Sequence, residues 1–160
     1  MSMVRGHEPQ VMRTIAAKVL GYHLANRNQL FDLPPSDLGD LPEAQAAWLV
    51  RAMMVAAHAD GKMDADERNR VLAALGSARM SDQLRVALRS ELDEPQCLET
   101  LVRQVESRAQ AARFYAVSLI AIDRQSPVSR LFLAYLAERL ALPADLVVRL
   151  NRRLGMLQDR

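Results

Sequence analysis

Residues 46–59 read AAWLVRAMMVAAHA, and this stretch decides the fold. Its apolar residues cover nearly every face of a helix, which is typical of a helix at the centre of a bundle. The run is interrupted by Arg51 and His58, and it is too short to span a bilayer. Residues 114–122, FYAVSLIAI, form a second run of the same kind. We therefore expect two central helices that are buried more deeply than the rest of the chain.

The composition is that of one helical domain. The chain has 160 residues, of which 50% are hydrophobic and only 4% are aromatic. Its apolar residues are mostly Ala, Leu, Val and Met, a mixture that favours helices, whereas strands would need more β-branched and aromatic residues. A chain of this length can bury a core without disulfides. The sequence therefore predicts an all-α, single-domain helical bundle.

Apolar stripes and capping residues predict six further helices, for seven to eight in all. The stripe of Met12, Ile15, Val19 and Leu20 predicts an amphipathic helix over residues 9–27. The stretch that follows is rich in Pro and Asp and reads as a linker. We expect this helix and linker to occupy residues 1–41, and the bundle to occupy residues 42–160.

Local signals place the ends of the helices in the bundle. Asp64, with Glu67 three residues later, forms the pattern of a capping box. Gly76 is the predicted left-handed stop of the helix that Asp64 begins. The other predicted starts are Ser81 or Asp82, Pro95, Ser107, Ser126 followed by Pro127, and the segment after Pro143.

Charge and cysteine content set limits on function. The 21 basic and 19 acidic residues give a net charge of +2, which is too balanced for a nucleic-acid-binding surface. The single cysteine, Cys97, is predicted to be a buried thiol among leucines, as in a reducing compartment. Trp48 and His58 are predicted to be core and boundary residues rather than ligands. We expect a cytoplasmic location.

The two central runs are followed by similar segments. Residues 59–68, ADGKMDADER, and residues 122–130, IDRQSPVSR, each carry an Asp, a short polar turn, a capping residue and an Arg. One residue must be gapped to align them. We interpret the similarity as a pseudo-repeat of a helical hairpin.

Four carboxylates near these turns form a candidate cation site: Asp60, Asp64, Glu67 and Asp123. Carboxylate oxygens suit hard cations such as Ca²⁺ or Mg²⁺. Asp60 and Asp123 each follow a helix C-terminus, where a negative charge costs about 0.3–1 kcal/mol unless a positive group compensates it. The alternative is structural, with Asp60 and Gly61 making a turn and Asp64 with Glu67 making a cap. The spacing is not that of an EF-hand, since its first ligands would fall inside a helix.

Residues 59–68 resemble the hallmark of the TerB-like superfamily, ADG followed by an apolar residue and a Glu. A closer similarity is to an uncharacterised bacterial family typified by YebE. Three segments carry it over residues 42–151: VRAMMVAAHADG at 50–61, SLIAIDRQSPVSR at 118–130 and LAERLAL at 136–142.

The resemblance implies a bundle of about seven helices, no known enzymatic activity and a suspected surface for divalent cations. Two family carboxylates are missing here, because Gln125 and Ser129 stand where the family has Asp and Glu. The losses predict weak binding of Ca²⁺ or Mg²⁺. The family's Gly-rich, apolar N-terminal region is replaced by the short basic helix.

No catalytic set or phosphate-binding loop is visible, so we expect a protein without enzymatic activity. The main hypothesis is a regulatory or protein-interaction module, a monomer or homodimer with a protein partner, which the resemblance links to metal or envelope stress. The alternative is an adaptor on the surface of the inner membrane. Residues 9–31 contain Arg13, Lys18 and Arg27 and no acidic residue, so the N-terminal helix would suit an anionic bilayer. The same apolar stripe would also suit packing on the bundle.

Overall fold

The computed structural model describes residues 38–94 and 96–158, with backbone alone for residues 155–158. The predicted helix at residues 9–27 and most of the predicted linker lie outside these ranges. Contacts divide the chain into Met1–Pro34 and Pro35–Arg160, and every described residue belongs to the second unit. That second unit is the subject of the following paragraphs.

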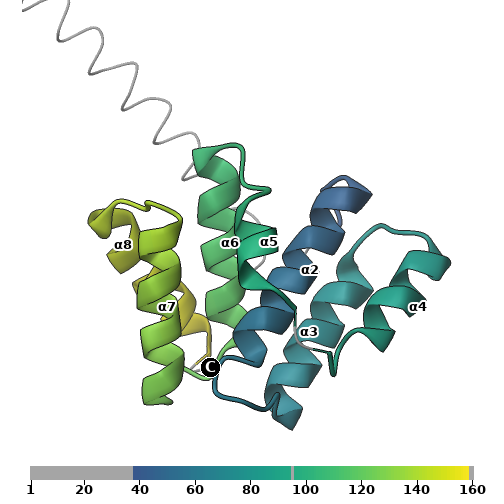
Figure 1. Ribbon diagram of the computed structural model, residues 1–160, viewed down its shortest axis with the longest axis horizontal. Helices are drawn as coiled ribbons and strands as arrows, with labels where there is room; N and C mark the ends of the chain where they lie inside the picture. The colour runs from purple at the N-terminus through teal and green to yellow at the C-terminus, as the bar shows by residue number, and fades with distance from the viewer. Residues whose placement is uncertain (1–37, 95, 159–160) are drawn as a thin grey trace, which may run out of the picture. The chain divides into compact units, whose positions relative to one another are not determined.

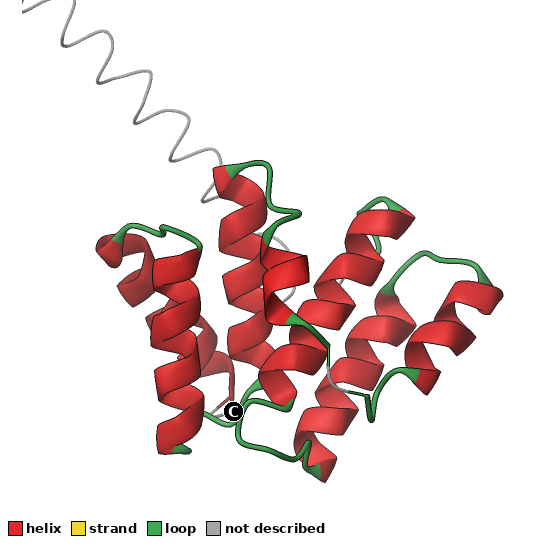
Figure 2. Cartoon of the chain, in the orientation of Figure 1, coloured by secondary structure: helices red, strands yellow, loops and turns green. Residues whose placement is uncertain are grey.

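The prediction of an all-α fold is confirmed for the described residues, which form helices and no strand (Figure 2). There are seven helices in this part of the chain: α2 (Glu43–Ala57), α3 (Ala65–Ser77), α4 (Asp82–Ser90), α5 (Leu98–Val102), α6 (Arg108–Ala121), α7 (Pro127–Arg139) and α8 (Ala144–Gln158). None of the described helices is long and apolar enough to cross a membrane.

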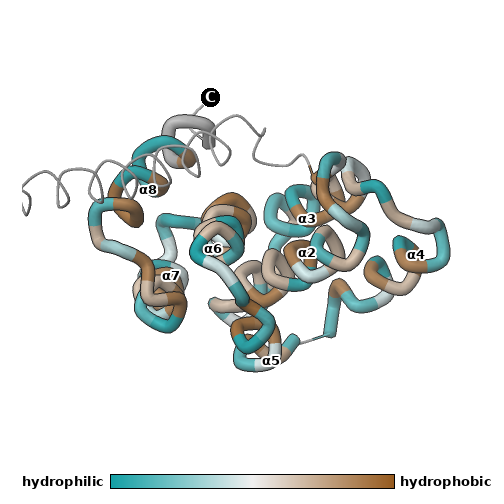
Figure 3. The backbone as a smooth tube through the Cα atoms, turned by 90° about the horizontal axis from the view of Figure 1, so that it is seen from above, coloured by the Kyte–Doolittle hydropathy of each residue, from teal (hydrophilic) through white to brown (hydrophobic). Residues whose placement is uncertain are grey.

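The two apolar runs form α2 and α6, which lie side by side in the middle of the unit (Figure 1). α3 and α4 lie beyond α2, whereas α7 and α8 lie beyond α6 (Figure 3). Both central helices are buried, and Met54 and Leu119 are completely inaccessible to solvent. Trp48 packs edge-on against Phe114, with 5.2 Å between the ring centroids. The predicted burial of the central helices is therefore confirmed.

Capping side chains start four of the helices as predicted. In each case a side-chain oxygen accepts a hydrogen bond from the backbone N–H three residues later, which satisfies one of the free donors of the first turn. The four capping residues are Asp64 for α3, Ser81 for α4, Ser107 for α6 and Ser126 for α7. α3 packs against α2 and α7 packs against α6, so each central helix is followed by a capped helix, as the pseudo-repeat requires.

Three local predictions were wrong. Gly76 is not a left-handed stop, because α3 continues to Ser77, whose hydroxyl donates to the Ala74 carbonyl and accepts from the Leu38 N–H. α5 begins at Leu98 rather than Pro95, since the backbone is still extended at Cys97. For the same reason Cys97 precedes the helix instead of lying on its buried side, and its thiol is exposed.

The end of α7 carries a backbone strain. Ala141, just after the helix, has φ 51°, in the left-handed region that favours glycine. The Leu142 N–H donates to the Ala137 carbonyl across this turn at 3.0 Å, which closes the end of the helix. The chain then reverses into α8.

Candidate functional site

Hydrogen bonds join three of the four predicted site residues, Asp64, Glu67 and Asp123, where the α2–α3 loop lies beside the α6–α7 loop, whereas Asp60 acts on Glu67 only through its charge. Gly61 has φ 104°, a conformation that a residue with a Cβ adopts only with strain, so the glycine sets the path of the first loop. Asp64 then caps α3, and its Oδ1 accepts from the Glu67 N–H at 2.7 Å. We call the four residues Asp60, Asp64, Glu67 and Asp123 the loop junction.

Glu67 is the centre of the loop junction. Its side chain is buried, with 1% of the residue exposed. One carboxylate oxygen, Oε2, accepts from the Asp64 N–H at 2.9 Å and completes the capping box. The other, Oε1, accepts from the Asp123 N–H at 3.2 Å. A single carboxylate therefore ties the loop after α2 to the loop after α6.

The charge of Glu67 is held in an unfavourable place. Burial raises the pKa of its carboxyl above the ordinary value, and the nearby charges of Asp64 and Asp60 act in the same direction. The two backbone N–H donors oppose this effect, because they stabilise the ionised form. The carboxylate is thus retained by its hydrogen bonds rather than by an opposite charge.

Asp123 is also used by the backbone. Its Oδ1 accepts from the Gln125 N–H at 2.9 Å, which shapes the turn before Ser126 caps α7. Asp60 and Asp64 are exposed. Within the described residues, no three His, Cys, Asp or Glu side chains are placed to hold a metal ion together. Binding of Ca²⁺ or Mg²⁺ by the loop junction stays a prediction.

Sequence reasoning identified the capping box but missed the hydrogen bond from Asp123 to Glu67. A signal for burial was present, because Glu67 shares a helix face with Val71, Ala74 and Leu75, at spacings of four, seven and eight residues. A carboxylate on the apolar face of a helix needs hydrogen-bond donors from another element. The sequence does not say which element provides them.

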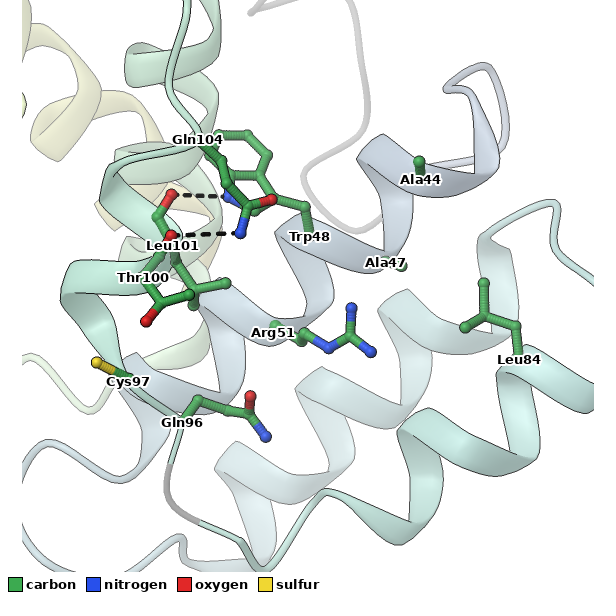
Figure 4. Close-up of a pocket in the computed structure, with 10 residues that line it drawn as sticks. All are labelled: Ala44, Ala47, Trp48, Arg51, Leu84, Gln96, Cys97, Thr100, Leu101 and Gln104. Atoms are coloured by element: carbon green, nitrogen blue, oxygen red, sulfur yellow. Dashed lines mark hydrogen bonds between the residues drawn. The ribbon is translucent and has the colours of Figure 1, made fainter.

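A groove lies between α2, α4 and α5, with a volume of about 540 Å³ (Figure 4). Trp48 and Leu101 form one side and Leu84 lies across from them, with Arg51 between. The Trp48 indole N–H donates to the Leu101 carbonyl at 3.0 Å, which fixes α5 to α2. The volume falls in the range of small-ligand sites.

The polar groups of the groove are already paired. Arg51 makes a two-point ion pair with Glu91, at 3.0 and 3.2 Å, and this contact raises the pKa of the guanidinium. Cys97 lies at the edge, where hydrogen bonds from Thr100 lower the pKa of its exposed thiol. Because Glu91 neutralises Arg51, the groove does not offer an unpaired positive charge to an anion.

α7 presents apolar side chains to solvent. Val128 is 51% exposed, Leu131 72% and Tyr135 47%, although each occupies a helix whose opposite side is packed against α6. The three residues are spaced by three and four positions, so they share one side of the helix. We call them the α7 face.

Tyr135 is held in place within the α7 face. Its hydroxyl donates to Glu99 Oε1 of α5 at 3.1 Å, and Arg139 donates to both oxygens of the same carboxylate. The hydrogen bonds from Arg139 lower the pKa of the Glu99 carboxyl most, and the hydrogen bond from Tyr135 lowers it further. The ring is therefore presented to solvent in a fixed orientation.

Comparison with known proteins gives a family match and one named relative. A family model described as "Protein of unknown function (DUF533)" matches residues 10–154. An "Uncharacterized protein in ampR 5'region" of Yersinia enterocolitica is 28% identical over 97 residues, which cover 61% of this chain and 70% of the relative. No solved structure matches the chain.

Proposed function

This chain belongs to the DUF533 family, and we propose that it is a non-enzymatic module that binds a protein partner through the α7 face. The observation that carries the proposal is the exposure of Val128, Leu131 and Tyr135 on one side of α7. Large apolar side chains grouped on a surface indicate an interaction site, whereas scattered ones do not. Tyr is also among the residues that contribute most to binding at protein interfaces.

The loop junction supports a role without chemistry. Both carboxylate oxygens of Glu67 accept hydrogen bonds from backbone N–H groups. The carboxylates of Asp64 and Asp123 accept from the backbone N–H groups of Glu67 and Gln125, respectively. A general acid or base needs an oxygen within reach of a substrate. Glu67, Asp64 and Asp123 therefore act in shaping the two loops and holding them together.

The wider assignment is part of the proposal. The ADG motif at residues 59–61, with Glu67, supports the proposal that the chain is a member of the TerB-like superfamily, and with it a link to metal or envelope stress. In the structure this motif forms a turn and the capped start of α3, so it stabilises the fold. A weak cation site at the loop junction would add a means of regulation.

A photo-crosslinking amino acid at position 131 tests the interaction in cells. The matched control is position 86 on α4, where the apolar side chain of Val86 is 67% exposed but stands apart from the α7 face. We expect protein adducts from position 131 and none from position 86. Equal labelling, or no adduct at either position, would contradict the proposal.

A further inference from the structure

We propose that the partner of the α7 face is a second copy of this chain, docked with its α7 antiparallel to the first. This inference rests on the proposed function and names the partner. It is carried by the distribution of charge and size along α7, which is self-complementary about Ala134.

The exposed side of α7 has a simple arrangement. At 3.6 residues per turn, Leu131 lies in the middle of the solvent-facing surface, Ala134 lies toward one edge and Tyr135 toward the other. The buried positions, Ser129, Leu133 and Leu136, lie on the opposite side. A second helix laid along the exposed side would therefore meet an apolar centre with a small residue beside it. Small side chains allow two helices to approach closely.

Charges of opposite sign stand at equal distances from Ala134. Arg130 is four residues before it and Glu138 is four residues after it, about 6 Å along the axis in each direction. Both side chains are exposed, and neither takes part in the ion pairs of the described residues. Arg130 makes one long hydrogen bond, at 3.5 Å, to the Gln125 carbonyl.

A two-fold axis through Ala134 pairs these groups. In such an interface each residue that contacts a second residue is contacted by it in return. Arg130 of one copy then lies opposite Glu138 of the other, twice, and Ala134 lies opposite itself. A parallel arrangement would instead place like charges together. The charges thus select the antiparallel pairing.

Tyr135 suits the same interface. In the antiparallel arrangement its ring reaches toward Leu131 of the second copy, on the edge of α7 away from Ala134. The ring is already fixed by Glu99, so little side-chain freedom is lost on docking. The contact adds an aromatic anchor to an aliphatic centre.

Sedimentation of the full chain tests the proposal, since a monomer has a mass of 17.9 kDa. We expect a concentration-dependent dimer. Leu131→Glu should weaken it at least about 30-fold, the effect of losing a central anchor. Val86→Glu, an equivalent change on α4, should leave it unchanged. Both positions are exposed, so both variants should fold, which circular dichroism verifies.

Charge exchange tests the pairing. Arg130→Glu and Glu138→Arg should each weaken the dimer, whereas the double variant should restore it. Ala134→Cys in a Cys97→Ser background should oxidise to a disulfide-linked dimer, because the two sulfurs meet at the axis; Val86→Cys in that background should not.

A wild-type chain that stays monomeric at millimolar concentration would overturn self-association. So would a dimer that Leu131→Glu leaves intact. If the monomer still forms adducts with a different protein from position 131, the proposed function stands and only the second copy is excluded. A monomer without adducts excludes both.

Discussion

Glu67→Ala is expected to destabilise the protein more than Asp66→Ala, a change in the same turn of α3. The substitution removes the acceptor of two backbone N–H groups, those of Asp64 and Asp123. A buried donor left without a partner costs about 1–3 kcal/mol. Water can reach the Asp64 end of the loop junction, so we expect a total loss of about 2–4 kcal/mol. That is a large part of the 5–15 kcal/mol (roughly) that stabilises a domain.

Urea denaturation followed by far-ultraviolet circular dichroism measures this loss. The matched control is Asp66→Ala, which removes the neighbouring carboxylate, an exposed one, from the same helical turn. The control should lose only a favourable interaction with the helix dipole, about 0.3–1 kcal/mol. The slope of the unfolding free energy against urea should stay the same in both variants. Equal losses in the two variants would refute the role given to Glu67.

Four further predictions follow from single features. Burial raises the pKa of the Glu67 carboxyl above 4.5, so the folded state binds the proton of this carboxyl more tightly than the unfolded state does. The free energy of unfolding should therefore fall as the pH rises from 4.5 through the folded pKa. Urea midpoints measured across that range should depend less on pH for Glu67→Gln than for the wild type. Ala141→Gly should raise the free energy of unfolding by about 0.5–1 kcal/mol by relieving the left-handed backbone, whereas Ala134→Gly inside α7 should lower it by a similar amount. Met54→Asp should lower the free energy of unfolding by about 3 kcal/mol or more, because an unpaired charge would be buried at a fully inaccessible position. A variant with the melting temperature of the wild type would contradict this prediction. Calorimetric titration with Ca²⁺ and Mg²⁺ should show weak binding, with a dissociation constant in the millimolar range or higher, and Asp60→Asn should abolish it. If no heat is released, the residues of the loop junction serve only as helix caps and turns.

The fold was predictable because its signals are local or nearly uniform. An apolar run that covers all sides of a helix indicates a central position whatever surrounds it, and a capping residue acts only three positions away. Ser126 and Asp64 could therefore be placed from spacing alone. Cys97 could not, because the short α5 is positioned by the hydrogen bond between Trp48 and Leu101, a contact 53 residues apart in sequence.

The candidate sites were less predictable for the same reason. The capping role of Glu67 is a local pattern, but its second acceptor serves the N–H of Asp123, 56 residues away. Apolar residues on α7 were visible in the sequence, yet nothing there indicated which of them α6 would cover. Leu133 and Leu136 became core, whereas Leu131 remained at the surface.

Trp48 is the single tryptophan of the chain, and it sits where three helices meet. Its indole N–H is bound to α5, its ring packs on Phe114 of α6, and its backbone belongs to α2. An indole in an apolar, hydrogen-bonded setting emits at a shorter wavelength than one in water. The natural protein thus contains an intrinsic fluorophore that registers the separation of any of these helices. The same ring borders the groove, so a molecule that entered there would lie beside this fluorophore.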